Sequence, residues 1–436
     1  MLNTGWAPPG GIEDRSFQLR HAVGRTSSTS PNAHPARAGP GLTWIKGHGL
    51  RPRYTTAMPE TAPAPAASRG ERTARLPLDR EIDRSSAAPC PASTPGPTPE
   101  PLRGKLAVLP RARWAVQLAV LGLVLLVGAE LVLFHRQVML DLPLTVRRPP
   151  AVEGFLPISA LLGLKRLLLT GQWDHVHPAG LTLLVAAIAT SFAARKAFCG
   201  WICPVGAVSR MLAALGERTL WRRRRSPALV PRPLDLALSV PKYLLLGFFL
   251  WVVGVQMDLR AINQFLHLPY NYAADAKMLR LFLELSLTTA LVLAGLGVLS
   301  VVVRNFWCRY LCPYGALLGL ASLFSPQRVR RDASACTDCR RCTRACPAEI
   351  AVHRKQTVWS PECVGCMGCV AACPVPGCLT NGGRKKKAWS PWLVPALGIG
   401  VLLFAWATAR LTGHWESRLP IELLVDAYRT TGLGHP

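Results

Sequence analysis

Residues 336–347 read CTDCRRCTRACP, and residues 363–374 read CVGCMGCVAACP. Each run places four cysteines in the order C-x₂-C-x₂-C-x₃-C and ends with a proline. This spacing is typical of the thiolate ligands of two cubane [4Fe–4S] clusters, because two-residue gaps let the backbone wrap three corners of one cube. A zinc site needs two C-x₂-C pairs instead of two four-cysteine runs. The runs therefore predict two iron–sulfur clusters, which pass single electrons.

In such pairs of runs, the fourth cysteine of each run ligates the other cluster. One cluster is therefore expected to be held by Cys336, Cys339, Cys342 and Cys373. The other is expected to be held by Cys346, Cys363, Cys366 and Cys369. Both sets are complete without Cys378, for which we expect no ligand role. Residues 349–361 link the runs and are expected to form a small β-hairpin with Val352 and Val358 facing inward.

Composition points to a membrane. The chain has 436 residues and a formal net charge of +27. In a soluble domain this charge would suggest nucleic-acid binding, but several apolar stretches approach the 20 residues that span a bilayer core. The predicted spans are residues 114–134, 178–194, 236–255, 281–303 and 392–409. A further stretch over 155–169 is broken by Lys165 and Arg166, so we expect it at the membrane interface. Nucleic acid is not expected as a partner.

Most of the basic residues gather on one side of the predicted membrane. They precede the first span (Arg111, Arg113), fill the loop after the second with a run at 222–225, follow the fourth, and precede the fifth at 384–387. Cytoplasmic loops carry an excess of Lys and Arg, and a reducing compartment keeps thiols free for iron. We therefore expect a multi-pass protein of the bacterial inner membrane with its cysteine runs in the cytoplasm. Arg147, Arg148, Lys165 and Arg166 are exceptions on the opposite side.

The predicted fold class is an α-helical membrane protein, with about five transmembrane helices and an inserted small α+β two-cluster domain. Residues 1–102 are rich in Pro, Ala, Ser and Arg, so we expect a disordered tail in which Cys90 has no role. No cleavable signal peptide is expected near Met1, and Met58 is an alternative start. The later parts are predicted as a membrane core over 103–328, a two-cluster domain over 329–383, a fifth transmembrane helix over 384–412 and an external tail over 413–436.

A second cysteine pattern is repeated inside the membrane core. Residues 198–207 read FCGWICPVGA, and residues 307–316 read WCRYLCPYGA. Both copies read C-x₃-C-P-x-G-A at the point where a predicted span leaves the membrane, and an amphipathic stretch follows each (208–215 and 317–324). Repeats in membrane proteins commonly place a shared site at their interface.

Cysteines four residues apart lie on one face of a helix. Cys199, Cys203, Cys308 and Cys312 could therefore supply four thiolates to a third centre. Thiolates suit a third iron–sulfur cluster or a reduced copper ion. A redox-active disulfide is another interpretation. In a further one the prolines and glycines shape the helix ends while the thiols stay free, and the sequence leaves these alternatives open.

Oxidation of a quinol would need a proton acceptor near the membrane. Glu130 and Glu284 lie near the external ends of the first and fourth predicted spans, and His177 stands at the entrance of the second, fixed by Pro178. These three residues are candidates for quinol or proton handling. An interfacial histidine bonded to backbone or lipid, and glutamates that serve helix packing, are the alternatives.

Two membrane-exit C-x₃-C-P-x-G motifs followed by two four-cysteine runs resemble the NapH-type membrane polyferredoxins, over about residues 110–410. The NosR-type and CcoG/FixG-type proteins share the same membrane core. The resemblance implies quinol dehydrogenation, a cluster role for the eight cysteines of the runs, and the role of the membrane-exit motif for Cys199, Cys203, Cys308 and Cys312. The tail before the core does not fit the flavin domain of NosR-type proteins, and C-P-x-G in both copies favours the NapH-type branch.

The favoured function is a membrane-bound relay of electrons between the quinone pool and a redox partner, as a subunit of an oxidoreductase. Alternatives are a copper reductase that uses the C-x₃-C-P thiolates, and an assembly or regulatory protein whose redox state controls a partner. Expected partners are membrane lipid, quinol, and a reductase, cytochrome or ferredoxin. Basic residues near the runs, such as Arg340, Arg341 and Arg344, are expected to raise the cluster potentials by stabilising added negative charge.

Overall fold

The computed structural model describes residues 106, 108–220, 230–383 and 388–433. The predicted tail over 1–102, with Met58 and Cys90, lies outside the described residues, as do the basic runs at 222–225 and 384–387. The longer helices are α2 (Leu109–Met139), α3 (Pro157–Thr170), α4 (Pro178–Ala194), α5 (Pro204–Thr219), α6 (Arg232–Trp251), α9 (Ala274–Leu283), α10 (Leu287–Val302), α14 (Leu393–Leu411) and α15 (Ile421–Leu433).

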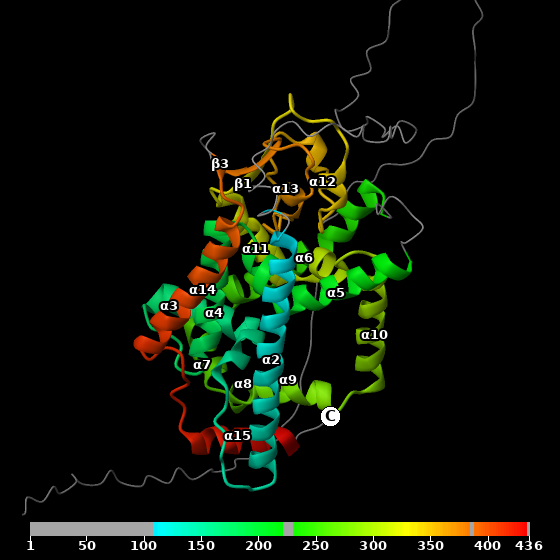
Figure 1. Cartoon of the computed structure of the whole chain (residues 1–436). Coiled ribbons are helices and arrows are strands. Elements are labelled where there is room, and N and C mark those ends of the chain that lie inside the picture. The colour runs from blue at the N-terminus through cyan, green and yellow to red at the C-terminus, as the bar shows by residue number, and fades with distance from the viewer. Residues whose placement is uncertain (1–105, 107, 221–229, 384–387, 434–436) are drawn as a thin grey trace, which may run out of the picture. The chain divides into compact units, whose positions relative to one another are not determined.

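Shorter helices join them. These are η1 (Pro150–Phe155), η2 (Phe198–Ile202), η3 (Val252–Gln256), α7 (Leu259–Leu266), α8 (Pro269–Tyr272), η4 (Trp307–Leu311), α11 (Pro313–Ala321), η5 (Ser322–Phe324), α12 (Arg341–Arg344), η6 (Val352–Arg354) and α13 (Gly368–Ala371). The strands are β1 (Arg328–Arg331), β2 (Leu379–Gly382) and β3 (Ala388–Trp389). Figure 1 shows the strands with α12 and α13 at one end of the helices and α15 at the other, with α2 running between the two ends.

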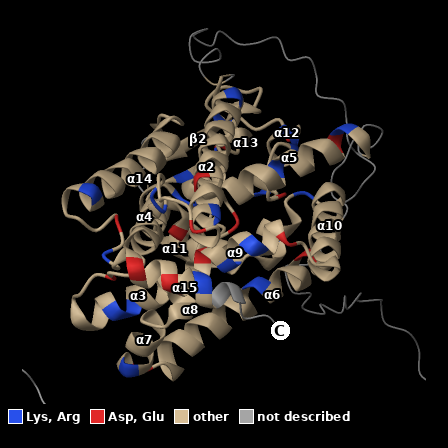
Figure 2. Cartoon of the chain, turned by 90° about the horizontal axis from the view of Figure 1, so that it is seen from below, with Lys and Arg blue, Asp and Glu red and all other residues tan. Residues whose placement is uncertain are grey.

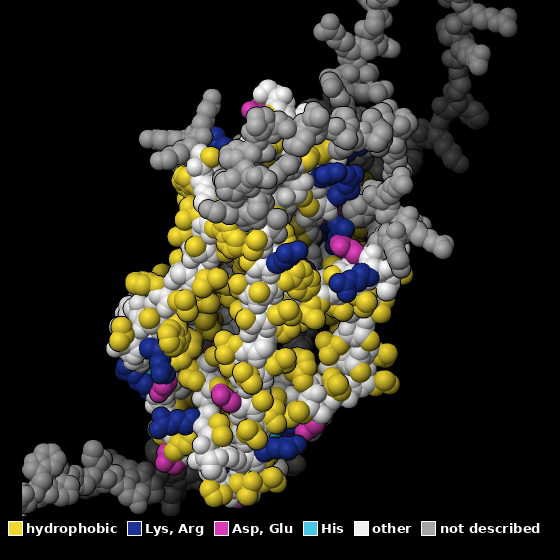
Figure 3. Space-filling model, viewed as in Figure 1, with side chains coloured by type: hydrophobic (Ala, Val, Ile, Leu, Met, Phe, Trp, Pro, Cys, Tyr) yellow, Lys and Arg dark blue, Asp and Glu magenta, His cyan; other side chains and the backbone are white. Residues whose placement is uncertain are grey.

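Three of the predicted spans are confirmed as helices long and apolar enough to cross a membrane. In the part of the chain that the structure describes, these are α2, the continuous helix Pro233–Gln256 (α6 with η3), and α14. Few of their residues are buried inside the protein, because their leucines and valines point outward, as a lipid environment favours. Hydrophobic side chains accordingly dominate the middle of the face in Figure 3.

The other two predicted spans are confirmed only in part. Residues 178–194 do form a helix, α4, but its 17 residues make only about 26 Å at 1.5 Å per residue. A bilayer core is about 30 Å thick. Most residues of α4 are buried, and it packs against α14, α3 and α11. It is a short interior helix, and whether it spans stays a prediction.

The predicted span over 281–303 is broken. α9 and α10 meet at an angle of 82°, so that together they could form at most one bent span. The break has a local cause at Ser286, whose hydroxyl accepts the Thr289 N–H at 3.2 Å and caps a new helix. Serine caps compete in this way with helix continuation. The continuous hydropathy of this stretch concealed the cap.

Lys165 explains one exception to the charge rule. The interfacial stretch predicted over 155–169 is the helix α3, and Lys165 lies in its second half. Its ammonium donates to the backbone carbonyls of Val253, Gly254 and Met257 at 2.6–3.0 Å. Carbonyls at the end of a helix have no partners within it, so Lys165 caps the end of the long α6–η3 helix.

The cysteine-rich region contains the small sheet expected of an α+β domain. Its strand order is β1-β2-β3, and both pairings are antiparallel, with Arg328 opposite Gly382 and Asn381 opposite Trp389. The hairpin predicted over 349–361 is wrong, because this link forms the 3₁₀ turn η6 and then only an isolated bridge to β1. Val352 and Val358 are nevertheless buried as expected, at 1% and 2% exposure. The domain boundaries stay predictions.

The segment predicted as an external tail contains the helix α15. One face of it packs on α2 and α8, where Leu424, Ala427 and Tyr428 contact Phe134 and Val138. Viewed from this end, acidic and basic residues gather around α9 and α15 (Figure 2). The C-terminal segment therefore closes this end of the helices.

Candidate functional site

Two small cavities divide the eight cysteines of the runs into two groups of four. Cavity 1 is lined by Cys336, Cys339, Cys342 and Cys373. Cavity 2 is lined by Cys346, Cys363, Cys366 and Cys369. In each cavity three cysteines come from one run and the fourth comes from the other. This is the grouping that the spacing predicts for two clusters, while ligation itself stays a prediction.

The two runs fold into loops of the same shape. The residues directly before and after the second cysteine of each run have positive φ: Asp338 (50°) and Arg340 (59°) in the first, Gly365 (60°) and Met367 (56°) in the second. Such left-handed residues turn the backbone sharply. The third cysteine then lies in a one-turn helix, α12 or α13. Three thiols of one loop can therefore face one cavity.

Cys378 also lines cavity 1. It is 3% exposed, and its thiol donates to the Asp332 carbonyl over 3.7 Å. It lies within electrostatic range of Cys336 and Cys373. The structure thus places a fifth thiol beside the predicted set, and its role as a bystander stays a prediction.

A single metal ion and a cubane make different demands on cysteines. Among residues 106, 108–220, 230–383 and 388–433, no three His, Cys, Asp or Glu side chains converge closely enough to share one metal ion. In a cubane each thiolate binds a separate iron, so the thiols stay further apart. The finding therefore concerns a mononuclear zinc or copper site, and it leaves the cubane prediction as it stands.

Each copy of the repeated C-x₃-C-P motif forms a π-turn. The Cys203 N–H donates to the Phe198 carbonyl at 2.8 Å, and the Cys312 N–H donates to the Trp307 carbonyl at 3.0 Å. Both bonds reach back five residues. Each cysteine pair therefore lies on a π-turn instead of a regular α-helix, and a π-turn contains one more residue than an α-turn. Such turns are frequent at functional sites. The shared face of each pair stays a prediction.

Cys203 and Cys312 cap the helices that follow the two π-turns. α5 begins at Pro204 and α11 at Pro313, where proline is favoured because the first helical N–H groups have no partner within the helix. The Gly315 N–H donates to Cys312 Sγ at 3.2 Å. A helix N-terminus favours negative charge. Both cysteines therefore lie at the N-terminus of a helix, and the Cys312 thiol accepts a bond from the backbone of its helix.

The two motifs bring their four thiols within electrostatic range of one another. Burial is the largest effect on the pKa of three of them, Cys199, Cys203 and Cys308. It raises the pKa of Cys203 to about 11, that of Cys308 to about 12, and that of Cys199 well above its ordinary value. Lys196 opposes this rise at Cys199. Thiols of this kind are neutral near pH 7 until a cation favours the thiolate.

Ion pairs join the second motif to the cysteine-rich region. Arg309, in the middle of that motif, pairs with Glu349 at 3.0 Å. Lys242 of α6 is fully buried, donates to the Arg309 carbonyl at 2.7 Å and pairs with Glu362 at 2.5 Å. Burial would raise the pKa of Glu362, but Lys196 and Lys242 hold it below its ordinary value. Glu362 directly precedes Cys363, so these charges fix the loop of cavity 2.

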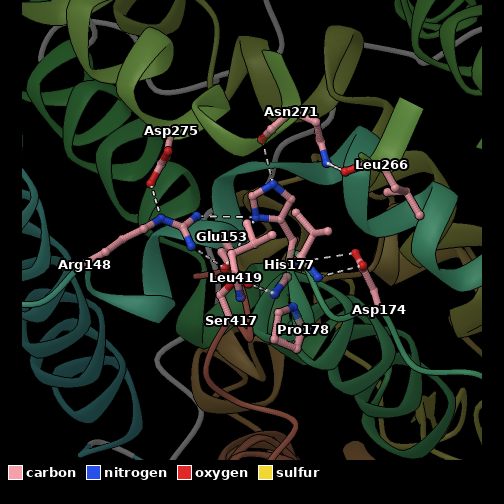
Figure 4. A network of polar contacts seen from close by, with 12 residues as sticks. Arg148, Glu153, Asp174, His177, Pro178, Leu266, Asn271, Asp275, Ser417 and Leu419 are labelled. Atoms are coloured by element: carbon pink, nitrogen blue, oxygen red, sulfur yellow. Dashed lines mark hydrogen bonds and ion pairs between the residues drawn. The ribbon is translucent and has the colours of Figure 1, made fainter. Parts of the chain in front are cut away.

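His177 lies in a buried polar network at the N-terminus of α4, the end far from the first repeated motif (Figure 4). Its Nε2 donates to the Asn271 carbonyl at 2.8 Å, since a carbonyl can only accept. Its Nδ1 lies 3.4 Å from both a Glu153 carboxylate oxygen and an Arg148 nitrogen. The Asp174 carboxylate accepts the His177 backbone N–H at 3.3 Å. His177 is therefore bonded to backbone, and about 26 Å of α4 separate it from the Cys199 end.

Arg148 is the centre of this network. It pairs with Asp275 at 2.6 Å and with Glu153 at 2.8 Å, and both carboxylates are fully buried. Burial acts against its charge, but Asp275 and Glu153 raise the pKa of Arg148 above its ordinary value. The Tyr428 hydroxyl of α15 donates to Asp275 at 2.8 Å. The network therefore ties the C-terminal helix to the helices around it.

The two glutamates predicted to handle protons lie outside this network. Glu130 is exposed on α2. Glu284 lies at the break between α9 and α10, where it pairs with Arg280 at 3.1 Å and its side chain is 57% exposed. The structure does not bring Glu130, His177 and Glu284 together, so their roles in quinol or proton handling stay predictions.

Arg113 is a site residue that the sequence indicated only as a topology signal. It is 9% exposed, and its Nε donates to the Gly200 carbonyl, inside the first repeated motif, at 2.7 Å. Gln117, one helical turn later, donates to the same carbonyl at 3.1 Å and accepts from Arg210 at 2.8 Å. An arginine one helical turn before a glutamine was the available signal, but the position of Arg113 at the start of a predicted span indicated only membrane topology.

Comparison with known families identifies both cysteine patterns. A family described as a 4Fe-4S binding domain matches residues 176–227 and 285–331, which contain the two C-x₃-C-P motifs. A family described as a 4Fe-4S dicluster domain matches residues 328–374, which contain both four-cysteine runs. The chain is therefore an iron–sulfur protein. No solved structure matches the chain.

Relatives among known proteins carry electron-transport names. One relative is YccM of Escherichia coli, which is provisionally named as an electron transport protein. It is 41% identical to this chain over 64% of the chain and 78% of its own length. The methylamine utilization ferredoxin-type protein MauN of Methylorubrum extorquens is 31% identical over 45% of the chain and 62% of its own length. The ferredoxin-type protein NapH of Haemophilus influenzae is 28% identical over 45% of the chain and 67% of its own length. With its two cysteine patterns and these relatives, the chain belongs to the NapH-type family of ferredoxin-type electron transport proteins.

Proposed function

We propose that this protein is a membrane-bound electron relay with two [4Fe–4S] clusters, one in each cavity. The four thiols of cavity 1 (Cys336, Cys339, Cys342, Cys373) and the four of cavity 2 (Cys346, Cys363, Cys366, Cys369) would hold them. When bound, such clusters accept and donate single electrons. The observation that carries the proposal is the grouping of eight distant cysteines into two sets of four around two cavities.

The membrane placement rests on the apolar helices and the basic residues. α2, α6 with η3, and α14 are long and apolar enough to span, and we infer that the bent pair α9–α10 and the short helix α4 complete a multi-pass core. The cysteine-rich region would face the cytoplasm of a bacterial inner membrane, since basic residues favour that side. Labelling of single introduced cysteines from each side of sealed vesicles tests this orientation.

The four thiols of the repeated motif would hold a third iron–sulfur centre. Support comes from their mutual electrostatic range, from the helix N-termini that face Cys203 and Cys312, and from the 4Fe-4S family match over both motifs. Four thiols shared by two repeat-related turns are the donor set of a cubane, in which each thiolate binds its own iron. A copper ion at these thiols is an outcome of the test below.

The proposed donor or acceptor in the membrane is the quinone pool. A quinol releases two electrons and two protons when it is oxidised, so its site needs a proton acceptor. His177, Glu130 and Glu284 are the proposed acceptors, and His177 is already fixed in a buried network. On the cytoplasmic side, a reductase, cytochrome or ferredoxin is the proposed redox partner.

Anaerobic purification with metal analysis tests the cluster content. Two cubanes give about eight irons per chain and three give about twelve. Replacing Cys199 and Cys308 together with serine should remove about four irons and leave the signals of the other two clusters unchanged. Unchanged iron would contradict the third cluster, and copper in place of that iron would favour a copper reductase.

Addition of menaquinol or ubiquinol, followed by electron paramagnetic resonance spectroscopy, tests the relay. We expect at least one of the two quinols to reduce a cluster. If neither quinol does so while dithionite does, the protein carries electrons but not from the quinone pool. His177→Gln, Glu130→Gln and Glu284→Gln should each be compared, since the proton acceptor among them should lose quinol-driven reduction and keep its iron.

A further inference from the structure

The two cavities differ in what surrounds them. Both copies of the repeated motif contact the loops of cavity 2. A Cβ at Gly200 would overlap the Val364 carbonyl oxygen, and the Trp201 indole donates to the Gly365 carbonyl at 3.2 Å. Val364 and Gly365 lie between Cys363 and Cys366. The first motif therefore touches the loop that supplies most of the thiols of cavity 2.

The second motif, and Asn305 just before it, reach the residues that follow Cys346, the remaining cysteine of the same cavity. Asn305 donates to the Pro347 carbonyl at 3.1 Å, directly after Cys346. Arg309 pairs with Glu349 two residues further on. Cavity 2 is thus enclosed from both sides by the motifs that carry the four other thiols. Cavity 1, in contrast, is lined by Arg331 and Arg340.

Buried positive charge accompanies cavity 2. Arg113 is 9% exposed and lies within electrostatic range of Cys366 and Cys346, two thiols of this cavity. Arg210 also acts on Cys366, and burial together with Arg113 lowers the pKa of Arg210 to about 10. Gln117 bridges the two arginines by bonding both the Gly200 carbonyl and Arg210. Arg113 is therefore held in place by the motif backbone.

The arginines at cavity 1 are in a different medium. Of the two arginines that line cavity 1, Arg331 is half-buried and bonds to Cys336, and the Arg340 side chain is 35% exposed. Arg341 and Arg344, in the same loop, are exposed. Water and salt screen such charges over about 10 Å, whereas a buried charge acts through a lower effective dielectric constant. Reduction adds one negative charge to an iron–sulfur centre. A buried cation therefore favours the reduced form more strongly than an exposed cation at a similar separation.

We propose that Arg113 is a positioning residue that selectively raises the reduction potential of the iron–sulfur centre in cavity 2. The proposal rests on the proposed function, since it requires clusters in both cavities. In this proposal cavity 2 is the inner site, and a residue of the membrane core sets its reduction potential. Cavity 1 is the outer site, and Arg113 does not control its reduction potential. The basic residues predicted to raise both potentials would then act mainly on cavity 1.

The test is a redox titration of the purified full-length protein followed by electron paramagnetic resonance. Arg113→Gln should shift the ratio of reduced to oxidised cavity 2 centre by about tenfold toward oxidised at a fixed potential, or about 59 mV for one electron. Arg113→Lys should restore most of this shift. Arg111→Gln is the matched control, because Arg111 is exposed two residues earlier on the same helix. The signals are assigned with Cys336→Ser, which perturbs cavity 1.

Several outcomes separate the inference from the function on which it rests. An equal shift in both centres, or no shift with full iron content, would overturn the role of Arg113 while the clusters stand. Absence of iron–sulfur signals in the wild type would instead overturn the proposed function. If Arg113→Gln loses iron, Arg210→Gln serves as the second variant. A smaller shift confined to cavity 2 would then support the proposal, and no shift there would contradict it.

Discussion

The molecule buries polar groups at both ends of its helices. At one end groups of opposite charge pair with each other, and at the other end groups of the same kind lie together. At the α15 end, Arg148 faces Asp275 and Glu153, so opposite charges meet within hydrogen-bond distance. At the opposite end, thiols face other thiols, and burial raises the pKa of Cys203 and Cys308. The first set is complete in the protein alone. The second set gathers several soft thiol donors around one place, which is the property expected of a metal cofactor site.

The largest expected effect is loss of a whole centre at the thiol end. Cys369→Ala should remove about four irons per chain, because Cys369 is a buried member of cavity 2 with no spare thiol among the residues that line that cavity. Metal analysis measures the iron content per chain. Cys378→Ala is the control, since cavity 1 keeps its four other thiols, and an equal loss of iron from both variants would show that Cys378 is a ligand.

A substitution at the α15 end should lower the stability of the protein without removing iron. Arg148→Ala leaves Glu153 and Asp275 buried without their cation, which costs about 3–5 kcal/mol for a broken buried ion pair. The thermal unfolding temperature in detergent should fall accordingly, and the protein that stays folded should keep its iron content. A large loss of iron at constant stability would mean that the two ends are not independent.

A smaller effect is expected where the same network loses one hydrogen bond. Tyr428→Phe removes the hydroxyl that donates to Asp275, while the Arg148 pair stays in place. Hydrogen bonds to charged groups contribute about 1.5–3 kcal/mol. Proteolysis should then cut near α15 sooner than in the wild type, because this bond helps to hold that helix. Equal cutting rates would assign the docking of α15 to its apolar face alone.

The smallest effect is expected at the contact between the first motif and cavity 2. Gly200→Ala must displace the loop at Val364, and overpacking of this kind costs about 1–3 kcal/mol. Gly295→Ala is the matched control on α10, where a Cβ meets nothing within 4 Å. Comparison of the two thermal unfolding temperatures in detergent should show a loss for Gly200→Ala alone. Similar values would mean that the loop yields without cost.

Much of the candidate site could be predicted from spacing. The crossing of Cys346 and Cys373 between the two runs follows from a ligand pattern that depends on local sequence alone. The long apolar helices α2, α6 and α14 were predictable because lipid imposes a length and a composition. Each of these features is a short-range property of the chain, so sequence is sufficient to indicate it.

The features that escaped prediction depend on contacts between distant residues or on one local competitor. Ser286 interrupts a continuous apolar stretch through a single cap. Arg113 indicates only membrane topology in the sequence, because the Gly200 carbonyl that it bonds lies 87 residues away in the chain. Lys165 violates the charge rule because the end of α6–η3 needs a donor. In each case hydropathy and charge describe the residue correctly, but its partner can be found only in three dimensions.

The interleaving of the runs has a consequence for the synthesis of the protein. Cavity 2 gains its last thiol when Cys369 is made, and cavity 1 gains its last when Cys373 is made. During translation, the thiols of the first run therefore remain without their complete set until nearly all of the second run has left the ribosome. A ribosome that stalls between the runs would therefore release a chain that can complete neither cavity.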